Sequence, residues 1–251
     1  MSELIIDAKN VVVEYVVGDL KNISLKEYIV KKLKGQYKVQ KFRAVDKVSF
    51  RLYTGDMLGI VGTNGAGKST LLKVITQIMH PSEGYVTVNG KIAALLELAS
   101  GFDPDLNIKE NAYLRGAMLG YTREFMDEKY KDIIEFSGLQ EFEERPFKHL
   151  SSGMKSKIAF SIASMVEPEI LILDEVLSVG DGAFREKSEN KMREIIANGK
   201  VTILVSHSIA QIRRMCNKVL WLDHGKQIAF GETKEICDKY EQFLKSGVLP
   251  G

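Results

Sequence analysis

The sequence predicts an α/β fold with a mixed, partly parallel β-sheet, and three observations support this class. A short apolar run, Met57–Val61, leads into a glycine-rich turn and then into an apolar helical pattern, so a strand, a tight loop and a helix follow one another. Ile170–Leu173 and Val201–Ser206 are short and largely apolar, as expected for parallel strands buried on both faces. Alternating segments near the start of the chain indicate further strands, and the turn at Asn89-Gly90 favours an antiparallel hairpin.

The N-terminal part is predicted to consist mostly of strands, with one helix after the glycine-rich turn. That helix fits Ser69–Met79 and stops near Pro81, because proline cannot continue a helix. The dipeptide Asn89-Gly90 favours a tight turn, so the strands on either side of it are expected to form a hairpin. The strands expected here are Leu4–Glu14, Val45–Tyr53, Met57–Val61, Tyr85–Val88 and Ile92–Leu96.

The rest of the chain alternates between helices and short strands. From Asn107 to about Lys148 the pattern is helical, with breaks at Gly120 and Gly138, and Ser152–Val166 fits a further helix. No internal repeat or linker is visible, and 251 residues are enough for one large α/β domain or two small ones. The later elements are expected to be Arg185–Asn198 (helix), Val201–Ser206, Val219–Asp223 and Gln227–Phe230 (strands) and Lys234–Lys245 (helix).

A basic segment at about residues 20–43 interrupts this order. Between Lys21 and Arg43 there are eight Lys or Arg residues and one acidic residue, Glu27. Ser24 and Glu27 fit a capping box, and the apolar residues that follow fall on one face of a helix. Such a helix either packs on the protein's own surface or contacts an anionic membrane or a membrane-embedded partner. Nucleic acid is a weaker third option, since no recognition motif accompanies the charge.

The glycine-rich turn, Gly62–Thr70, carries the most specific chemical signal. Its sequence has the spacing of a phosphate-binding loop, and it lies between a predicted strand and a predicted helix. The backbone N–H groups of such a turn and the positive end of the helix suit a polyphosphate. Lys68 can reach the β- and γ-phosphates, and the Ser69 hydroxyl can bind Mg²⁺. A nucleoside triphosphate is therefore the expected ligand.

Later positions fit the same chemistry. Asp174 and Glu175 end an apolar strand, where Asp174 can hold Mg²⁺ and Glu175 can orient or deprotonate the attacking water. Ser151 precedes a helix whose first N–H groups form a second anion site. His207 follows the strand at Val201–Ser206. None of these positions by itself identifies an ATP site. Their occurrence in this order after the phosphate loop is what supports the assignment.

Composition and charge place the chain among ordinary globular proteins. Hydrophobic residues make up 45% of it and charged residues 27%, with a net charge of +2, which does not indicate a nucleic-acid binder. No apolar stretch is long enough to cross a bilayer and no signal peptide begins the chain, so a cytoplasmic location is expected. Cys216 and Cys237 are expected to be small buried side chains or unreactive surface thiols in a reducing compartment.

The ordered motifs resemble the nucleotide-binding domain of ABC transporters over essentially the whole chain. This resemblance implies that residues 1–251 form a single domain with an ABC ATPase fold. That fold is a P-loop NTPase core with an antiparallel β subdomain and an inserted helical subdomain, expected at about residues 105–165. The resemblance also implies that the chain uses ATP and Mg²⁺. The matching segments are Gly62–Thr70 (Walker A), Leu150–Met154 (a variant signature), Leu171–Glu175 (Walker B with its glutamate), Ser178–Asp181 (D-loop) and His207 (switch histidine).

The same resemblance implies a head-to-tail, ATP-dependent homodimer. Each ATP would lie between Lys68 of one subunit and Ser151 and Gly153 of the other. The implied catalytic residues are Glu175 and His207, and the implied metal ligands are Ser69, Asp174 and Glu97. The implied nucleotide-binding residues are Tyr15, Gly62, Thr63, Asn64, Gly65, Ala66, Gly67, Lys68, Ser69, Thr70, Ser151, Gly153 and Asp174.

Two of these assignments have a competitor. Glu97 stands nearest to the place of the family's lid glutamine, although Leu98 aligns equally well. The basic segment splits the region that carries the adenine-stacking aromatic residue. That residue is Tyr15, at the end of the first strand, or Phe42, on the far side of the segment.

A narrower resemblance is to the ATPase subunits of bacterial polysaccharide exporters, which serve O-antigen, capsule or teichoic-acid export. The implied function is to power the export of a lipid-linked polysaccharide through a separate integral-membrane subunit, with this chain peripheral on the inner face of the cell membrane. Alternatives are another transporter's ATPase (drug, lipid or solute) and a soluble ABC-type switch on ribosomes or DNA. Some such exporters add a C-terminal carbohydrate-binding domain, and the sequence leaves this open. The segments that carry the narrower resemblance are Glu97–Pro104, Leu150–Met154, Asp174–Asp181 and Cys216–Gly231.

Overall fold

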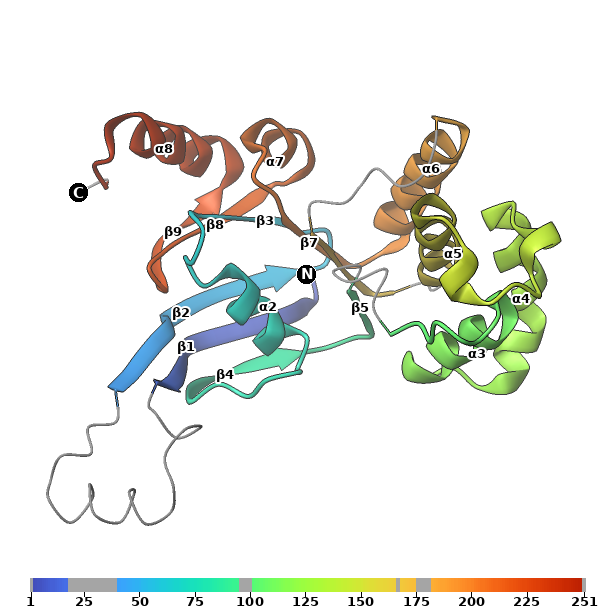
Figure 1. Ribbon diagram of the computed structural model, residues 1–251. Helices are drawn as coiled ribbons and strands as arrows, with labels where there is room; N and C mark the ends of the chain where they lie inside the picture. The colour runs from blue at the N-terminus through green and yellow to red at the C-terminus, as the bar shows by residue number, and fades with distance from the viewer. Residues whose placement is uncertain (1, 18–39, 95–100, 166–167, 175–181, 250–251) are drawn as a thin grey trace, which may run out of the picture.

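The computed structural model describes residues 2–17, 40–94, 101–165, 168–174 and 182–249 (Figure 1). The basic amphipathic helix expected within 20–43 lies outside these residues. The strands are β1 (Leu4–Val17), β2 (Gln40–Tyr53), β3 (Met57–Val61), β4 (Glu83–Val88), β5 (Ile92–Ala94), β6 (Ile170–Asp174), β7 (Val201–Val205), β8 (Lys218–Asp223) and β9 (Lys226–Glu232). The α-helices are α2 (Lys68–Ile75), α3 (Ile108–Met118), α4 (Arg123–Ser137), α5 (Ser152–Ser164), α6 (Gly182–Asn198), α7 (Ile209–Met215) and α8 (Thr233–Ser246).

The strands form one mixed sheet in the order β4-β1-β2-β9-β8-β3-β7-β6-β5. The central strands β8, β3, β7 and β6 run parallel to one another, and β5 is parallel to β6. In contrast, β1 runs antiparallel to both β2 and β4, and β9 runs antiparallel to β8. The central strand β7 is buried along its whole length, as its apolar sequence predicts. The expected α/β fold with a mixed sheet is confirmed.

The hairpin predicted around Asn89 and Gly90 is wrong. β4 pairs with β1, and β5 pairs with β6. These strands are therefore the two edges of the sheet. A two-residue hairpin of the Asn-Gly type needs a positive φ at both central residues, and only Gly90 has one (φ 138°). Instead, the Asn89 N–H group donates to the carbonyl of Ile5 in β1, at 2.9 Å. Pairing with distant strands thus overrides the local turn signal.

The sheet curls around α2. β4 ends at Val88 and β5 begins at Ile92, so a short link joins the two opposite edges of the sheet. Even fully extended, this link spans no more than about 15 Å. The edges must therefore approach each other. One hydrophobic core joins β1 and β2 to the central strands through α2, which buries Leu71, Leu72, Val74 and Ile75.

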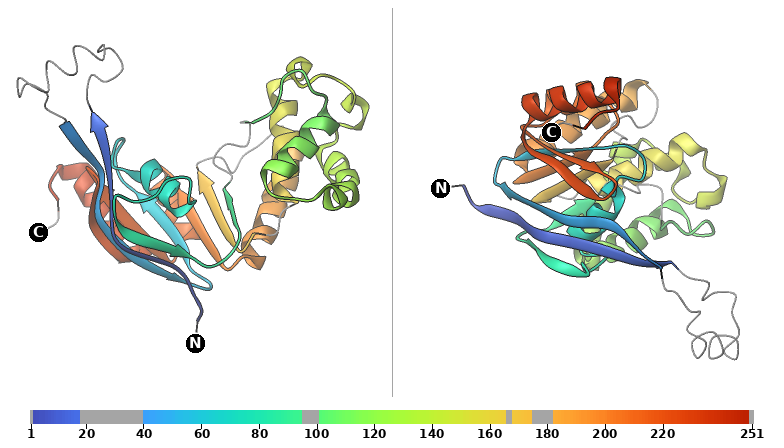
Figure 2. Two further views of the ribbon diagram at one scale, coloured as in Figure 1. Left: turned by 90° about the horizontal axis from the view of Figure 1, so that it is seen from below. Right: turned by 90° about the vertical axis from the view of Figure 1, so that its left-hand side faces the viewer.

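Helices α3, α4 and α5 pack around a hydrophobic cluster of their own and stand to one side of the sheet (Figure 2). α3 begins with a capping box made by Asn107 and Glu110, and α4 ends at Gly138 in a left-handed conformation (φ 68°). Ile108, Ile133 and Ile158 are among the fully or almost fully buried members of this cluster. The helical pattern and the breaks expected here are confirmed.

Some element boundaries differ from the expectation. α2 ends at Ile75 rather than near Met79, because Gln77 takes a left-handed backbone (φ 60°) that a helix cannot contain. β2 begins at Gln40, inside the segment expected to be inserted, because its first residues pair with the end of β1. The short helix α7 was not expected. It is capped by the Ser208 hydroxyl, which accepts the Gln211 N–H group at 3.3 Å.

Both cysteines are buried free thiols, in keeping with the expectation. Burial raises the pKa of the Cys216 thiol to about 12, so this side chain stays protonated and behaves as a small apolar group. Within the described ranges, no helix has both the length and the apolar composition needed to cross a membrane.

We expect Trp221 to be the most sensitive position in the contact between β8 and α8. Its ring is fully buried, and the ring centroids of Tyr240 and Phe243 each lie 5.2 Å away. Trp221→Ala should lower the free energy of unfolding by about 3–5 kcal/mol, because it removes a large ring and leaves a cavity. Denaturant unfolding followed by circular dichroism measures this loss.

Trp221→Phe is the matched variant. No acceptor among the described residues bonds to the indole N–H group, so phenylalanine removes ring volume but no hydrogen bond. Its cost should be only roughly 1–2 kcal/mol. Equal losses for the two variants would contradict this account of the β8–α8 contact.

Candidate functional site

The phosphate loop connects β3 to α2 through a turn that only glycine tolerates well. Gly62, Gly65 and Gly67 all have positive φ angles, of 151°, 79° and 100°. Side-chain-bearing residues rarely adopt such angles, because their Cβ meets the backbone. The spacing of the glycines in the sequence therefore fixes the backbone path of the loop.

Two of these glycines also permit close contact with other strands. A Cβ on Gly62 would collide with the carbonyl oxygen of Leu222 in β8, and one on Gly67 would collide with the carbonyl oxygen of Ala44 in β2. By contrast, nothing lies within 4 Å of the place that a Gly65 Cβ would take. The loop is thus held between β8 and β2, while its tip at Gly65 stays open.

Positive charge gathers at this loop. Lys68 folds back over it, and its Nζ donates to the carbonyl oxygens of Gly62, at 2.6 Å, and Thr63, at 3.0 Å. The N-cap of α2 is Gly67, which has no side chain to accept the N–H groups of the first turn. The helix dipole adds partial positive charge at the same place. These groups fit a phosphate anion, as the sequence predicts.

A cavity of about 410 Å³ opens over the loop. This size suits a small-molecule ligand. The loop forms its floor, and residues from β1, β2 and the end of β7 complete it. The lining residues are Tyr15, Phe42, Ala44, Asn64, Gly65, Ala66, Gly67, Lys68, Ser69, Thr70, Val205 and His207. The structure therefore brings together the loop, both candidate aromatic residues and His207.

The two candidate aromatic residues lie opposite each other. Tyr15 of β1 and Phe42 of β2 are register partners, so their side chains share one face of the sheet. Tyr15 is half-buried, packs against the main core and directs its hydroxyl to Met79 Sδ, at 3.7 Å. Phe42 is 56% exposed. Tyr15 and Phe42 together form the aromatic wall of the cavity, in which Tyr15 is packed and Phe42 is exposed.

Asp174 lies close to the cavity, at the end of β6. It pairs with Val205 of β7, and Val205 lines the cavity. The Asp174 side chain, Glu175, Glu97 and the segment Ser178–Asp181 lie outside the described part of the structure. The roles expected for them stay predictions.

The signature residues lie on a separate surface. Ser151 is the N-cap of α5, and its Oγ accepts the Met154 N–H group at 3.3 Å. Ser151 and Gly153 are both exposed. No described residue of α5 lines the cavity over the phosphate loop. Within one copy of the chain, the phosphate loop and the start of α5 therefore do not form a common site.

One contact of the loop was missed from the sequence. The Thr63 hydroxyl donates to Asp223 Oδ1 at 3.4 Å, and Asp223 ends β8. β8 and β3 are parallel neighbours, so their carboxyl ends meet at the same edge of the sheet. The available signal was Asp223, the polar residue that ends the apolar run at 219–222. It could be linked to the loop only once β8 was known to lie next to β3.

The sequence that forms this site also matches a known protein family. The sequence profile described as "ABC transporter" matches residues 45–178, from β2 past the end of β6. This chain belongs to the ABC transporter family. It is therefore an ABC-type ATPase, as the order of its motifs predicts.

Relatives of this ABC protein include export ATPases. It is 39% identical to the O-antigen export system ATP-binding protein RfbB of Klebsiella pneumoniae, over 82% of this chain and 84% of the relative. It is 40% identical to the teichoic acids export ATP-binding protein TagH of Bacillus anthracis, over 88% of this chain but only 39% of the relative. The expected similarity to ATPase subunits of polysaccharide exporters is confirmed.

Solved ABC structures share the fold. An ATP-binding subunit of an ABC transporter has a TM-score of 0.69 at 23% identity, covering 98% of this chain and 95% of its own. A dimeric ATP-binding cassette in a post-hydrolysis state, bound to ADP and Pi, has a TM-score of 0.67 at 20% identity, covering 91% and 98%. The expected ABC ATPase fold is confirmed.

Substitution of Gly62 should damage the loop itself. Gly62→Ala places a methyl group against the Leu222 carbonyl at a positive φ, so the free energy of unfolding without nucleotide should fall by about 2–4 kcal/mol. Gly65→Ala is the matched control, because its φ is also positive but its surroundings are open, and it should cost roughly 1 kcal/mol. Denaturant unfolding compares them, and equal costs would rule out the steric explanation.

Proposed function

We propose that this ABC ATPase powers the export of a lipid-linked polysaccharide through a separate membrane-spanning partner. One observation carries the proposal: the chain is similar, over more than four fifths of its length, to ATP-binding proteins named for O-antigen and teichoic acid export. Because this chain spans only 39% of the B. anthracis relative, the proposal concerns the ATPase part of such a protein.

The cavity over the phosphate loop is the proposed ATP site. A triphosphate brings several negative charges to a place where Lys68 and the N-terminus of α2 supply positive charge. The N–H groups of the glycine-rich turn add hydrogen-bond donors. The residues proposed to bind the phosphates are Gly62, Thr63, Asn64, Gly65, Ala66, Gly67, Lys68, Ser69 and Thr70.

The aromatic wall is proposed to hold the base. Phe42 offers an exposed ring face, which a flat base can cover. Tyr15 packs beside it and is tied to Met79. We therefore assign direct stacking to Phe42 and place Tyr15 at the back of the same wall. Both residues contribute to the nucleotide site in this assignment.

Further residues are proposed to hold Mg²⁺ and to carry out the hydrolysis. Ser69 and Asp174, with Glu97 as a third candidate, would hold Mg²⁺, which neutralises charge on the β- and γ-phosphates. Glu175 orients the attacking water and accepts its proton as the bond from the γ-phosphorus to the bridging oxygen breaks. His207 lines the cavity, where it can bond to the γ-phosphate.

A second copy of the chain is proposed to complete each site. Ser151 and Gly153 are exposed at the start of α5, whose first-turn N–H groups suit an anion. In a head-to-tail dimer these groups would meet the γ-phosphate held by the partner's phosphate loop. ATP would then bridge two subunits, and hydrolysis would release them.

The proposed organisation follows from the same assignment. Residues 1–251 form a single ATP-binding domain, in which residues from about 105 to 165 are a helical subdomain. The separate hydrophobic cluster of α3, α4 and α5 supports this division. The chain is proposed to be cytoplasmic and peripheral on the inner face of the cell membrane, where its membrane-spanning partner holds it. Nucleic acid has no part in this proposal.

Glu175→Gln should trap the dimer. The variant keeps the groups that bind ATP but lacks the carboxylate that accepts the proton, so hydrolysis should fall at least about a hundredfold. Size-exclusion chromatography should then show a dimer with ATP and a monomer without it. Lys68→Ala is the control, because it should bind ATP weakly and stay monomeric under both conditions. Normal turnover by Glu175→Gln would refute the assignment of the base.

Export can be tested in the bacterium that carries the gene. Loss of the chain should remove a polysaccharide from the cell surface and leave its lipid-linked precursor inside. The wild-type chain should restore export, and Lys68→Ala should not. The chain should also co-purify with a membrane-spanning protein.

Unchanged surface polysaccharide, together with altered drug resistance or solute uptake, would instead identify another cargo. Co-purification with ribosomes would contradict a transporter role.

A further inference from the structure

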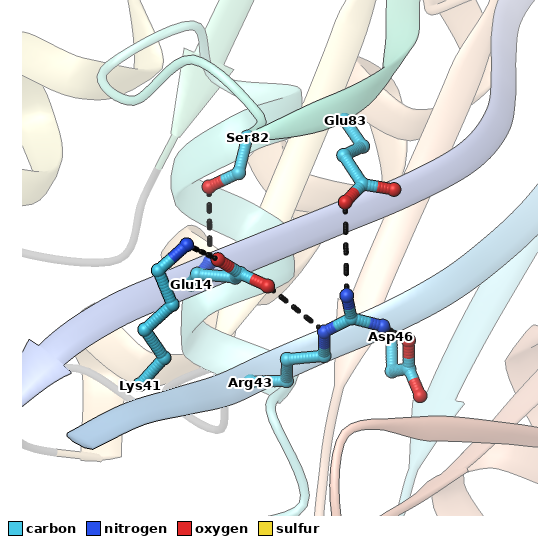
Figure 3. Close-up of polar contacts among 6 residues, drawn as sticks. All are labelled: Glu14, Lys41, Arg43, Asp46, Ser82 and Glu83. Atoms are coloured by element: carbon cyan, nitrogen blue, oxygen red, sulfur yellow. Dashed lines mark hydrogen bonds and ion pairs between the residues drawn. The ribbon is translucent and has the colours of Figure 1, made fainter. Parts of the chain in front are cut away.

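A cluster of charged side chains ties β1 to its neighbours near Val17, the last residue of β1 (Figure 3). Arg43 is at its centre. Its Nε lies 3.0 Å from Glu14 Oε1, its Nη1 3.0 Å from Asp46 Oδ1 and its Nη2 3.6 Å from Glu83 Oε1. One guanidinium therefore contacts carboxylates from β1, β2 and β4. The members of this Arg43 cluster are Glu14, Lys41, Arg43, Asp46 and Glu83.

The Arg43 cluster lies directly behind the aromatic wall of the cavity. Glu14 and Arg43 are register partners, and the next pair along the strands is Tyr15 and Phe42. Because successive residues of a strand point to opposite faces, the ion pair occupies one face and the aromatic pair the other. Arg43 itself does not line the cavity, whereas its neighbours Phe42 and Ala44 do.

Near this point β1 loses its pairing with β4, whereas its pairing with β2 continues to Val17. Register shifts interrupt the β1–β2 ladder repeatedly before Glu14, and such bulges increase local twist. The β1–β4 ladder ends at Val12, and beyond it the Ser82 hydroxyl accepts the Glu14 N–H group at 3.0 Å. The last residues of β1 therefore depend on β2 and on side-chain contacts for their position.

The ion pair between Glu14 and Arg43 is charged at neutral pH. Hydrogen bonds from Lys41 and, next, from Arg43 hold the pKa of the Glu14 carboxyl below its usual value. The Glu14 side chain is only 17% exposed, so its contacts are partly shielded from water. Arg43 is more exposed, and such ion pairs contribute little to overall stability. Their consequence is therefore expected in local geometry.

We propose that Arg43 is a positioning residue for nucleotide recognition, which holds the Tyr15–Phe42 wall in place by joining β1, β2 and β4. This rests on the proposed function, in which the cavity binds a nucleotide. Loss of Arg43 shifts the wall but leaves the phosphate loop intact. It therefore weakens recognition of the adenosine part and spares that of the phosphates.

The chain offers a matched control in Arg51. Its Nε lies 3.0 Å from Asp7 Oδ1, across the same two strands, and Asp7 and Arg51 are also register partners. Neither of them lines the cavity. Arg51→Gln therefore removes the same charge and a similar ion pair from the same sheet, without disturbing the aromatic wall.

The test compares ADP with pyrophosphate, which differ by the adenosine part. Isothermal titration calorimetry in the presence of Mg²⁺ measures both affinities. The wild-type chain should prefer ADP. Arg43→Gln should lower the ADP affinity about three- to tenfold, a part of what one base stack contributes, with less than about a twofold change for pyrophosphate. Arg51→Gln should leave both affinities unchanged.

Arg43→Lys provides a second variant. Lysine keeps the charge but lacks the planar fork of donors that reaches carboxylates on three strands, so the loss for ADP should be intermediate. If Arg43→Gln does not fold, the ratio of affinities for Arg43→Lys decides. Equal weakening of ADP and pyrophosphate, or behaviour like that of Arg51→Gln, overturns the positioning role. A wild-type chain without any preference for ADP instead overturns the assignment of the cavity to a nucleotide.

Discussion

The structure depends on one steric constraint, which is that the phosphate loop lies directly against the backbone of two other strands. Gly62 approaches Leu222 of β8, and Gly67 approaches Ala44 of β2, with no room for a side chain in either place. The backbone of Gly225, which bonds both to the loop and to β2, completes this joint. Because of it, a loop from the parallel strands and an aromatic wall from the antiparallel strands enclose one cavity.

Features whose signal lies within a few neighbouring residues could be predicted from the sequence. The spacing of Gly62–Thr70 alone specifies the loop and the start of α2. Gly138 alone marks the end of α4, and the apolar run of β7 marks a strand buried on both faces. The pair Asn89-Gly90 is equally local, and the hairpin it predicts is wrong. The strands on either side of it pair with β1 and β6 instead of with each other, and a local pattern carries no information about such distant partners.

Features that depend on pairing between distant segments could not be predicted. Tyr15 and Phe42 were both candidates for the base, but their direct opposition follows from the register of β1 and β2, which bulges shift. The position of Arg43 behind them follows from the same register. Ser151 poses a different problem, because its proposed ligand is held by another copy of the chain. A composite site of that kind is not a property of one folded subunit.

The short link between β4 and β5 has a consequence for the behaviour of the free subunit. It joins the two edges of the sheet, and edge strands expose unpaired N–H and C=O groups on which other chains can add and aggregate. The strand that enters the link, β4, has only six residues. Little of its backbone is thus offered to a passing chain. A short edge strand of this kind protects the subunit from edge-to-edge polymerisation while it is not assembled.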